Sequence, residues 1–238
     1  TLAVKSVETD GYVARILLRL TAPEDVELEG LNLGFDRSSF TTADRQFLSG
    51  GGNSSVVPDG DGLANTVNLL KEFHVTFQDG LRPYELGSVW ELNVTDLYVD
   101  RRRESSRILA EGDWHFSVTF DETNTDYREL ELLSAPTTLK ASTGWLADGT
   151  DVIEEFPVSS FRLRKFSSHV TWDSSSQTAA GDRLPYADFY VWHGHFACAV
   201  LKDGSQIELL GERNEEPIDL EQVDYVLLPD GTRLSAGS

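Results

Sequence analysis

With 238 residues, of which 39% are apolar and 10% aromatic, the chain is long enough for two modest domains or one large sandwich, and too apolar to be disordered. Its 40 acidic and 20 basic residues give a net charge of −20, so nucleic acids and anionic lipid surfaces would be repelled. A single cysteine, Cys198, excludes an intrachain disulfide and a zinc cluster held by thiolates.

Asp-Gly pairs such as Asp10-Gly11 and Asp203-Gly204 recur along the chain and predict tight turns. Glycine adopts positive φ without steric cost, and aspartate tolerates it. Between the turns, apolar and polar residues alternate, which is typical of half-buried strands. In chain order, strands are expected at 2–7, 12–20, 28–35, 73–77, 90–94, 114–120, 128–133, 161–166, 189–201, 206–210 and 225–228. Many short strands separated by turns indicate an all-β protein built from sandwiches.

Three segments depart from the strand pattern. Residues 49–62 are rich in glycine and serine and are expected to form a mobile loop. Residues 219–223 are expected to form one helical turn, because Asp219 can cap its first amides. The alternation breaks at 134–136, so the sequence predicts a domain boundary after Ala135.

Several segments together resemble a known family: VETDGY at 7–12 with the strand and TAP that follow, EGDWHFSV at 111–118, and IDLEQVDY at 218–225 before LPDGT. They are similar to the extracytoplasmic region of bacterial membrane proteins in the family called domain of unknown function 4179. The resemblance implies a short cytoplasmic segment, often anti-sigma-factor-like, one membrane span, and this β-rich part outside. It brings no catalytic residues. The expected fold is all-β, with two immunoglobulin-like β-sandwich domains in tandem: 1–135 resembling that domain, and 136–238 an immunoglobulin-like module.

His193 and His195 are the sharpest local pattern. Two residues apart on a strand, they would point the same way and could chelate a metal, with Asp188 or Glu208 as a third ligand. A solvent-facing histidine pair is the alternative, because a two-ligand pattern is weak by itself. The other side of this strand is expected to face the core: Trp192, Phe196, Cys198 and Val200.

Two tryptophans are candidates for a sugar-binding platform. Trp145 lies in a turn-like segment and Trp172 at a strand end, so both rings could be exposed and stack on a carbohydrate. The alternative is packing between domains. The basic cluster of Arg101, Arg102, Arg103 and Arg107 could meet an acidic partner or a wall polymer, or could pair locally with nearby acidic residues.

No motif for nucleophilic catalysis or phosphate binding occurs, so no enzymatic activity and no cofactor is expected. The function expected is a non-catalytic, extracytoplasmic sensory or binding region of a membrane-anchored, anti-sigma-factor-like regulator. A cell-surface adhesion or carbohydrate-binding module is the alternative. The expected partner is an unidentified extracellular ligand or protein, with cell-wall polysaccharide as one candidate and nucleic acid excluded. Membrane attachment is expected only through an anchor outside these 238 residues.

Overall fold

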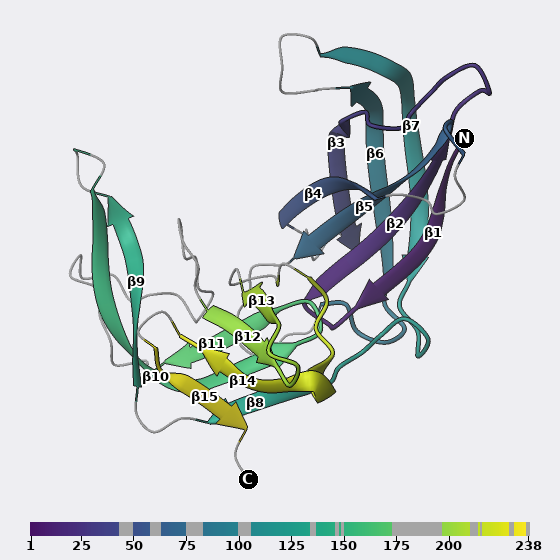
Figure 1. Cartoon of the computed structure of the whole chain (residues 1–238). Helices are drawn as coiled ribbons and strands as arrows, with labels where there is room; N and C mark the ends of the chain where they lie inside the picture. Colours follow the sequence, from purple (N-terminus) through teal and green to yellow (C-terminus); the bar gives the residue numbers. More distant parts are fainter. Residues whose placement is uncertain are drawn as a thin grey trace. The chain divides into compact units, whose positions relative to one another are not determined.

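The structure is a computed structural model that describes residues 1–42, 50–57, 63–74, 83–99, 106–133, 137–145, 148, 150–172, 197–209, 214, 216–228 and 231–236; of these, the side chains of 50–54, 133, 137–145, 151–160, 169–172 and 236 are not described. The chain forms two compact units. The N-terminal unit comprises Thr1–Val75 and Arg82–Asp126, and the C-terminal unit includes Tyr127–Ser238. The described elements are β-strands and one 3₁₀ turn, which confirms the all-β fold class (Figure 1).

Two antiparallel sheets make up the described strands of the N-terminal unit. One sheet has the order β1-β2-β5-β4 and the other has the order β3-β6-β7. Their bounds are β1 Leu2–Thr9, β2 Val13–Thr21, β3 Leu33–Thr42, β4 Gly50–Val57, β5 Thr66–His74, β6 Val89–Val99 and β7 Arg107–Thr119. If the strands are lettered A to G in chain order, the two sheets read ABED and CFG.

Aromatic rings join these two sheets. Phe40 of β3 stacks on Phe73 of β5 with ring centroids 4.9 Å apart. Trp90 of β6 and Tyr84, which precedes β6, also lie against Phe40, at centroid distances of 5.0 and 5.8 Å. All four side chains are fully buried. Because burial of large rings removes much apolar surface from water, this cluster is the centre of the N-terminal core.

Lys71 is a charged residue on the core side of β5. It alternates with Leu69 and Phe73, and only 2% of its surface is exposed. Its Nζ donates a hydrogen bond to Ser38 Oγ at 3.2 Å and lies 5.9 Å from the ring centroid of Phe35. The hydroxyl and the ring face both interact favourably with the ammonium group and so offset part of its desolvation.

The prediction of a loop at 49–62 is wrong for most of its first half. Strand β4 occupies Gly50–Val57 and pairs along β5, with Ser55 opposite Leu70 and Val57 opposite Asn68. A strand can be held by backbone hydrogen bonds to a neighbour even where its own side chains are small, and composition alone does not reveal this. Residues 58–62 lie outside the described part.

Two other strands are displaced from their expected positions. Strand β3 begins at Leu33 rather than at Leu28. Leu28 lies in the preceding loop, where its amide donates a hydrogen bond to the Ala64 carbonyl at 2.7 Å. Leu28 is nevertheless fully buried, which is why the segment resembles a strand in sequence. Strand β5 begins at Thr66 rather than at Phe73.

A continuous antiparallel path links the described strands of the C-terminal unit, in the order β11-β10-β8-β15-β14-β12-β13, with β9 paired to β10. The bounds are β8 Glu129–Leu133, β9 Thr137–Trp145, β10 Asp151–Arg164, β11 Ser168–Trp172, β12 Ala197–Leu201, β13 Gln206–Leu209, β14 Val223–Leu227 and β15 Arg233–Ala236. Its buried cluster is Leu132, Phe161, Leu163, Ala197, Ala199, Leu209, Ile218, Val223, Val226, Leu228 and Leu234.

The division between the units falls after Asp126, before β8. The sequence predicts it after β8, at Ala135. The difference has a simple cause, because β8 pairs with β10 through Leu132 and Phe161, and with β15 through Leu133 and Ser235. Strand β8 therefore belongs with the later strands.

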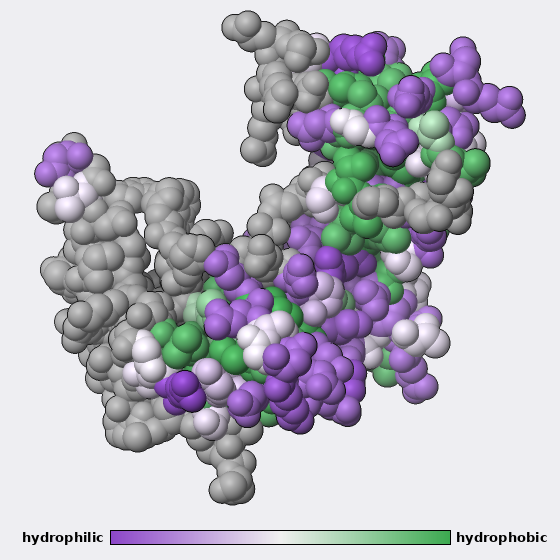
Figure 2. Space-filling view, viewed as in Figure 1, coloured by the Kyte–Doolittle hydropathy of each residue, from purple (hydrophilic) through white to green (hydrophobic). Residues whose placement is uncertain are grey.

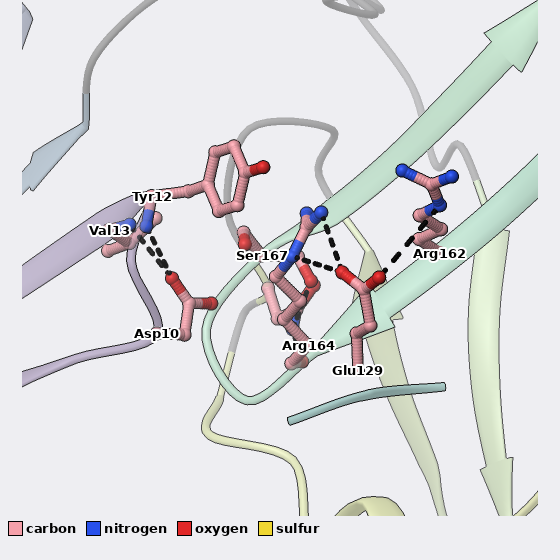
Figure 3. Close-up of polar contacts among 8 residues, drawn as sticks. Asp10, Tyr12, Val13, Glu129, Arg162, Arg164 and Ser167 are labelled. Atoms are coloured by element: carbon pink, nitrogen blue, oxygen red, sulfur yellow. Dashed lines mark hydrogen bonds and ion pairs between the residues drawn. The ribbon is translucent and has the colours of Figure 1, made fainter. Parts of the chain in front are cut away.

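The expected turns are confirmed where they are described. Gly11 has φ 90°, and Asp10 Oδ1 accepts hydrogen bonds from the amides of Tyr12 and Val13 at 3.0 and 2.9 Å (Figure 3). Gly204 has φ 85° in the β12–β13 hairpin. The helical turn is the 3₁₀ turn Leu220–Gln222, and its Glu221 amide donates to Asp219 Oδ1 at 3.0 Å.

A buried arginine anchors β10 in the C-terminal unit. Arg164 is 2% exposed, and its Nε and Nη2 donate to Glu129 Oε2 of β8 at 3.1 and 3.0 Å (Figure 3). Arg162 Nε lies 4.0 Å from Glu129 Oε1, an electrostatic contact rather than a hydrogen bond. The Asn214 side-chain amide donates to the Arg164 carbonyl at 3.0 Å. These bonds fix the end of β10 against β8.

Candidate functional site

Polar residues cover much of the visible described surface. Figure 2 shows hydrophilic residues over most of the visible described surface of the C-terminal unit and around an apolar band on the N-terminal unit. Among the described residues, the large apolar side chains that are mainly exposed are Leu63, Leu86, Val89 and Ile108. Scattered residues of this kind are normal on protein surfaces and do not define a site by themselves.

The outward face of the β3-β6-β7 sheet carries an ordered set of polar side chains, named here the polar grid. Residues two apart on a strand share a face, so the side chains next to the buried Phe40, Leu92 and Val94 point outward. Strand register then brings three strands together in three rows of three: Arg37, Thr95 and Asp113; Ser39, Asn93 and His115; Thr41, Glu91 and Ser117.

Hydrogen bonds connect the middle row. Asn93 Nδ2 donates to Ser39 Oγ at 3.5 Å, and His115 Nδ1 contacts Asn93 Oδ1. His115 Nε2 lies 3.2 Å from Asp113 Oδ1, and the side chains of these two residues are 62% and 63% exposed. Both ring nitrogens of His115 therefore face acceptor oxygens. The contacts orient four side chains from three strands while leaving the His115 end open to solvent.

A β-bulge lies directly beside the grid. Thr95 pairs with Asp113 and Leu97 with Ala110, so two residues of β7 lie opposite Asp96 alone. Asp96 has φ 36°, and its Oδ1 accepts a hydrogen bond from the Gly112 amide at 3.0 Å. Bulges increase local twist and re-aim the adjacent side chains. Thr95 and Asp113 are the last pair of the row pattern before the register shifts at this bulge.

A side chain at Gly112 would collide with a neighbouring ring. A Cβ at this position would lie 2.7 Å from Cζ2 of the Trp114 ring, closer than non-bonded carbons approach. The indole packs against the N-terminal core and meets Phe35 edge-on at a centroid distance of 6.2 Å. The residue after it, His115, is thereby held on the outward face.

The grid has a more balanced charge than the chain as a whole. It contains one arginine and two carboxylates, Arg37, Glu91 and Asp113, giving a net charge of −1 when His115 is neutral, against −20 for the chain. Arg37 is 86% exposed and lies 3.6 Å from Asp36. The arrangement offers donors and acceptors side by side and no strong field of one sign.

The residues singled out in the sequence do not lie in this grid. Trp145 ends β9 opposite Asp151, in a strand rather than a turn, and Trp172 ends β11 opposite Val158. Their side chains are outside the described part, so the aromatic platform stays a prediction. His193, His195 and Asp188 lie outside the described residues, as do Arg101, Arg102 and Arg103.

The prediction that Cys198 of β12 faces the core is wrong. Ala197 and Ala199 contribute to the buried cluster, whereas Cys198 is half-buried. Since side chains alternate along a strand, Cys198 points away from that cluster, in the row of Glu208 and Leu227. Val200 is buried at 6% exposure without joining the cluster.

Within the described ranges, no three His, Cys, Asp or Glu residues come together closely enough to hold a metal ion. In the same part of the chain, no helix is both long enough and apolar enough to cross a membrane.

The polar grid could not be found from the sequence. The sequence shows the alternation of Glu91, Asn93 and Thr95, but not which strands flank them. The contact between Asn93 and His115 spans 22 residues, and that between Asn93 and Ser39 spans 54. A second signal was the alternation Trp114-His115-Phe116, which places His115 on the other face of its strand from its two apolar neighbours.

Comparisons with protein-family models, with curated proteins and with solved structures give no match for this chain.

Proposed function

We propose that this chain is a non-catalytic binding region whose recognition surface is the polar grid on the β3-β6-β7 sheet. The observation that carries the proposal is the connected row of Ser39, Asn93 and His115. His115 also contacts Asp113 of the neighbouring row. Side chains that are already oriented lose less conformational freedom when a ligand binds. Recognition by such a surface needs no reaction centre.

We also propose that the N-terminal unit is an immunoglobulin-like sandwich. The strand order β1-β2-β5-β4 against β3-β6-β7 supports this, because the constant-type immunoglobulin fold has the order ABED against CFG. In such folds the sheet faces and end loops present binding residues on a rigid scaffold. For the C-terminal unit, an immunoglobulin-like fold remains a proposal that rests on the sequence resemblance.

The cellular context we propose is the extracytoplasmic part of a membrane-anchored, anti-sigma-factor-like regulator. The similarity of VETDGY, EGDWHFSV and IDLEQVDY to that family supports it. In this arrangement, a ligand bound outside would favour one state of the regulator and change sigma-factor release inside, which requires a different affinity for the two states. A surface adhesion module would use the same grid without a signal.

A reporter assay tests the regulatory role. Residues 1–238 would be deleted from the complete gene product, and transcription from promoters of the partner sigma factor would be measured in the native bacterium. We expect the deletion to change transcription severalfold, because the sensing part is lost while the inner segment remains. Unchanged transcription, with the shortened protein present in the membrane at normal abundance, would contradict the role.

A further inference from the structure

We propose that the polar grid binds an uncharged polysaccharide, lying across strands β3, β6 and β7. This inference rests on the proposed binding function and names the class of ligand. It uses residues other than Trp145 and Trp172.

The hydrogen-bonding groups of the grid match a ligand rich in hydroxyl groups. Arg37 only donates, Glu91 and Asp113 only accept when ionised, and the serine, threonine and asparagine side chains do both. A sugar hydroxyl also donates and accepts, so one repeating ligand can satisfy all of these groups. Glu91, which is half-buried, has an acidic side chain between two hydroxyl residues, Thr41 and Ser117.

The grid is a poor match to the centre of a protein interface. Such centres are depleted of charged residues and enriched in tyrosine, tryptophan and other large apolar side chains. The three rows contain charged and small polar residues throughout, and His115 has their only ring. A hydrated, hydroxyl-rich ligand is favoured over a protein partner.

Charge decides which polysaccharides fit. With His115 counted as neutral, the grid has a net charge of −1, and it belongs to a chain of net charge −20, so a polyanionic chain would be repelled as it approaches. An uncharged polymer meets no such barrier. Strands about 4.8 Å apart, with a rise of about 3.4 Å per residue, make the grid about 10 Å by 14 Å, which suits an extended ligand.

An apolar contact lies on the same face beyond the bulge. Tyr98 of β6 has Gly34 on one side and Ile108 on the other. Ile108 is 46% exposed, and nothing lies within 4 Å of the position where Gly34 would carry a Cβ. The open side of Gly34 leaves room beside the half-buried Tyr98, where the C–H face of a sugar ring can pack.

Affinity electrophoresis of the whole chain tests the proposal. Native gels would contain soluble β-glucan, mannan, galactan or an N-acetylglucosamine polymer, with polygalacturonate as the anionic comparison. We expect at least one uncharged polymer to retard the protein and polygalacturonate not to. Asn93→Ala and His115→Ala should each weaken the binding about tenfold, because each removes one hydrogen-bonding side chain of the connected row.

The matched control is Ser55→Ala, an exposed substitution on β4 of the other sheet. It should leave retardation unchanged. Equal retardation of Asn93→Ala, His115→Ala and the unaltered protein, all with cooperative thermal unfolding, would overturn the proposal, as would no retardation by any uncharged polymer. Unchanged retardation of the two variants would also remove the polar grid as the recognition surface, whereas no retardation by any uncharged polymer concerns the ligand class alone. The regulatory role is judged separately by the transcription assay.

Discussion

Buried charged residues are the most sensitive single positions in this molecule. Arg164 of β10 is 2% exposed, with both Nε and Nη2 bonded to Glu129. Lys71 lies in the N-terminal core against Phe35 and Phe73. A buried charge that keeps its partner adds little net stability, but removal of the partner leaves it uncompensated. The partners therefore matter more than the charged residues themselves.

Glu129→Gln tests this asymmetry. The amide keeps the shape of the carboxylate but removes its charge, so we expect the free energy of unfolding to fall by about 3 kcal/mol in urea titrations. Glu131→Gln on the same strand is the control, because Glu131 lies opposite Arg162 and not opposite the buried Arg164, and it should change stability by less than about 0.5 kcal/mol. Equal losses in the two variants would show that the Arg164 contact contributes nothing specific.

The hydrogen bonds to Asp203 in the β12–β13 turn predict that stability depends on pH. Hydrogen bonds from the Ser205 hydroxyl and amide, at 2.6 and 2.8 Å, hold the pKa of Asp203 below its ordinary value of 3.8. A lowered pKa in the folded state stabilises it above the unfolded pKa, and that gain disappears as the pH falls through the folded pKa.

Asp203→Asn removes the titrating group with little change of shape. We expect the variant to be less stable than the unaltered protein at pH 7, and the difference to shrink as the pH falls below 3.8, measured by thermal unfolding at a series of pH values. Ser205→Ala, which deletes the hydroxyl donor, should show a weaker form of the same trend. A difference that is constant with pH would argue against this origin.

At the scale of the element, the strands that the sequence indicated are those with alternating apolar residues, such as β2, β6 and β13. Strand β4 was missed because GGGNSS has no apolar pattern, and its place is set by the backbone of β5. Cross-strand register is likewise set by backbone pairing between strands and not by the local apolar pattern. The row of Ser39, Asn93 and His115 arises only when three strands far apart in sequence pair, which local patterns cannot encode.

Gly112→Ala probes the bulge between β6 and β7. The added Cβ would lie 2.7 Å from the Trp114 ring, so the indole, which contacts Phe35, or the nearby backbone must shift. We expect a loss of about 1–3 kcal/mol in stability, and a shift in tryptophan fluorescence. The change should also weaken ligand binding at the polar grid, because Asp113 follows directly.

Gly34→Ala is the control for this substitution. It adds the same methyl group to β3 of the same sheet, but nothing lies within 4 Å of the new Cβ. Its stability should be unchanged or slightly higher, since alanine restricts the unfolded chain more than glycine does. Similar losses at both glycines would mean that the strand backbone, and not Trp114, imposes the requirement.

At the scale of the whole molecule, each unit has its own buried cluster. The N-terminal cluster contains the aromatic residues Phe40, Phe73, Tyr84 and Trp90 and ends at Phe120, before the division at Asp126. The sequence predicted two domains and an all-β class. It placed the boundary later, because the pairing of β8 with β15 joins residues about a hundred positions apart.

A fragment of residues 1–126 should therefore fold by itself. We expect a single cooperative urea transition, followed by the fluorescence of Trp90 and Trp114, because all of the N-terminal cluster is present. The full chain provides the reference curve. A fragment with a broad transition and strong binding of a hydrophobic dye would indicate that its core needs residues beyond 126.

The double pairing of β15 has a consequence for biosynthesis. Strand β15 bonds to β14 on one side and to β8 on the other, so it closes the path between the first strand of the C-terminal unit and its last strands. A ribosome must therefore deliver Arg233–Ala236 before this sheet can become continuous, whereas β1–β7 are complete more than a hundred residues earlier. During synthesis, one half of the protein can mature while the other waits as an open chain, exposed to proteases and available to export machinery.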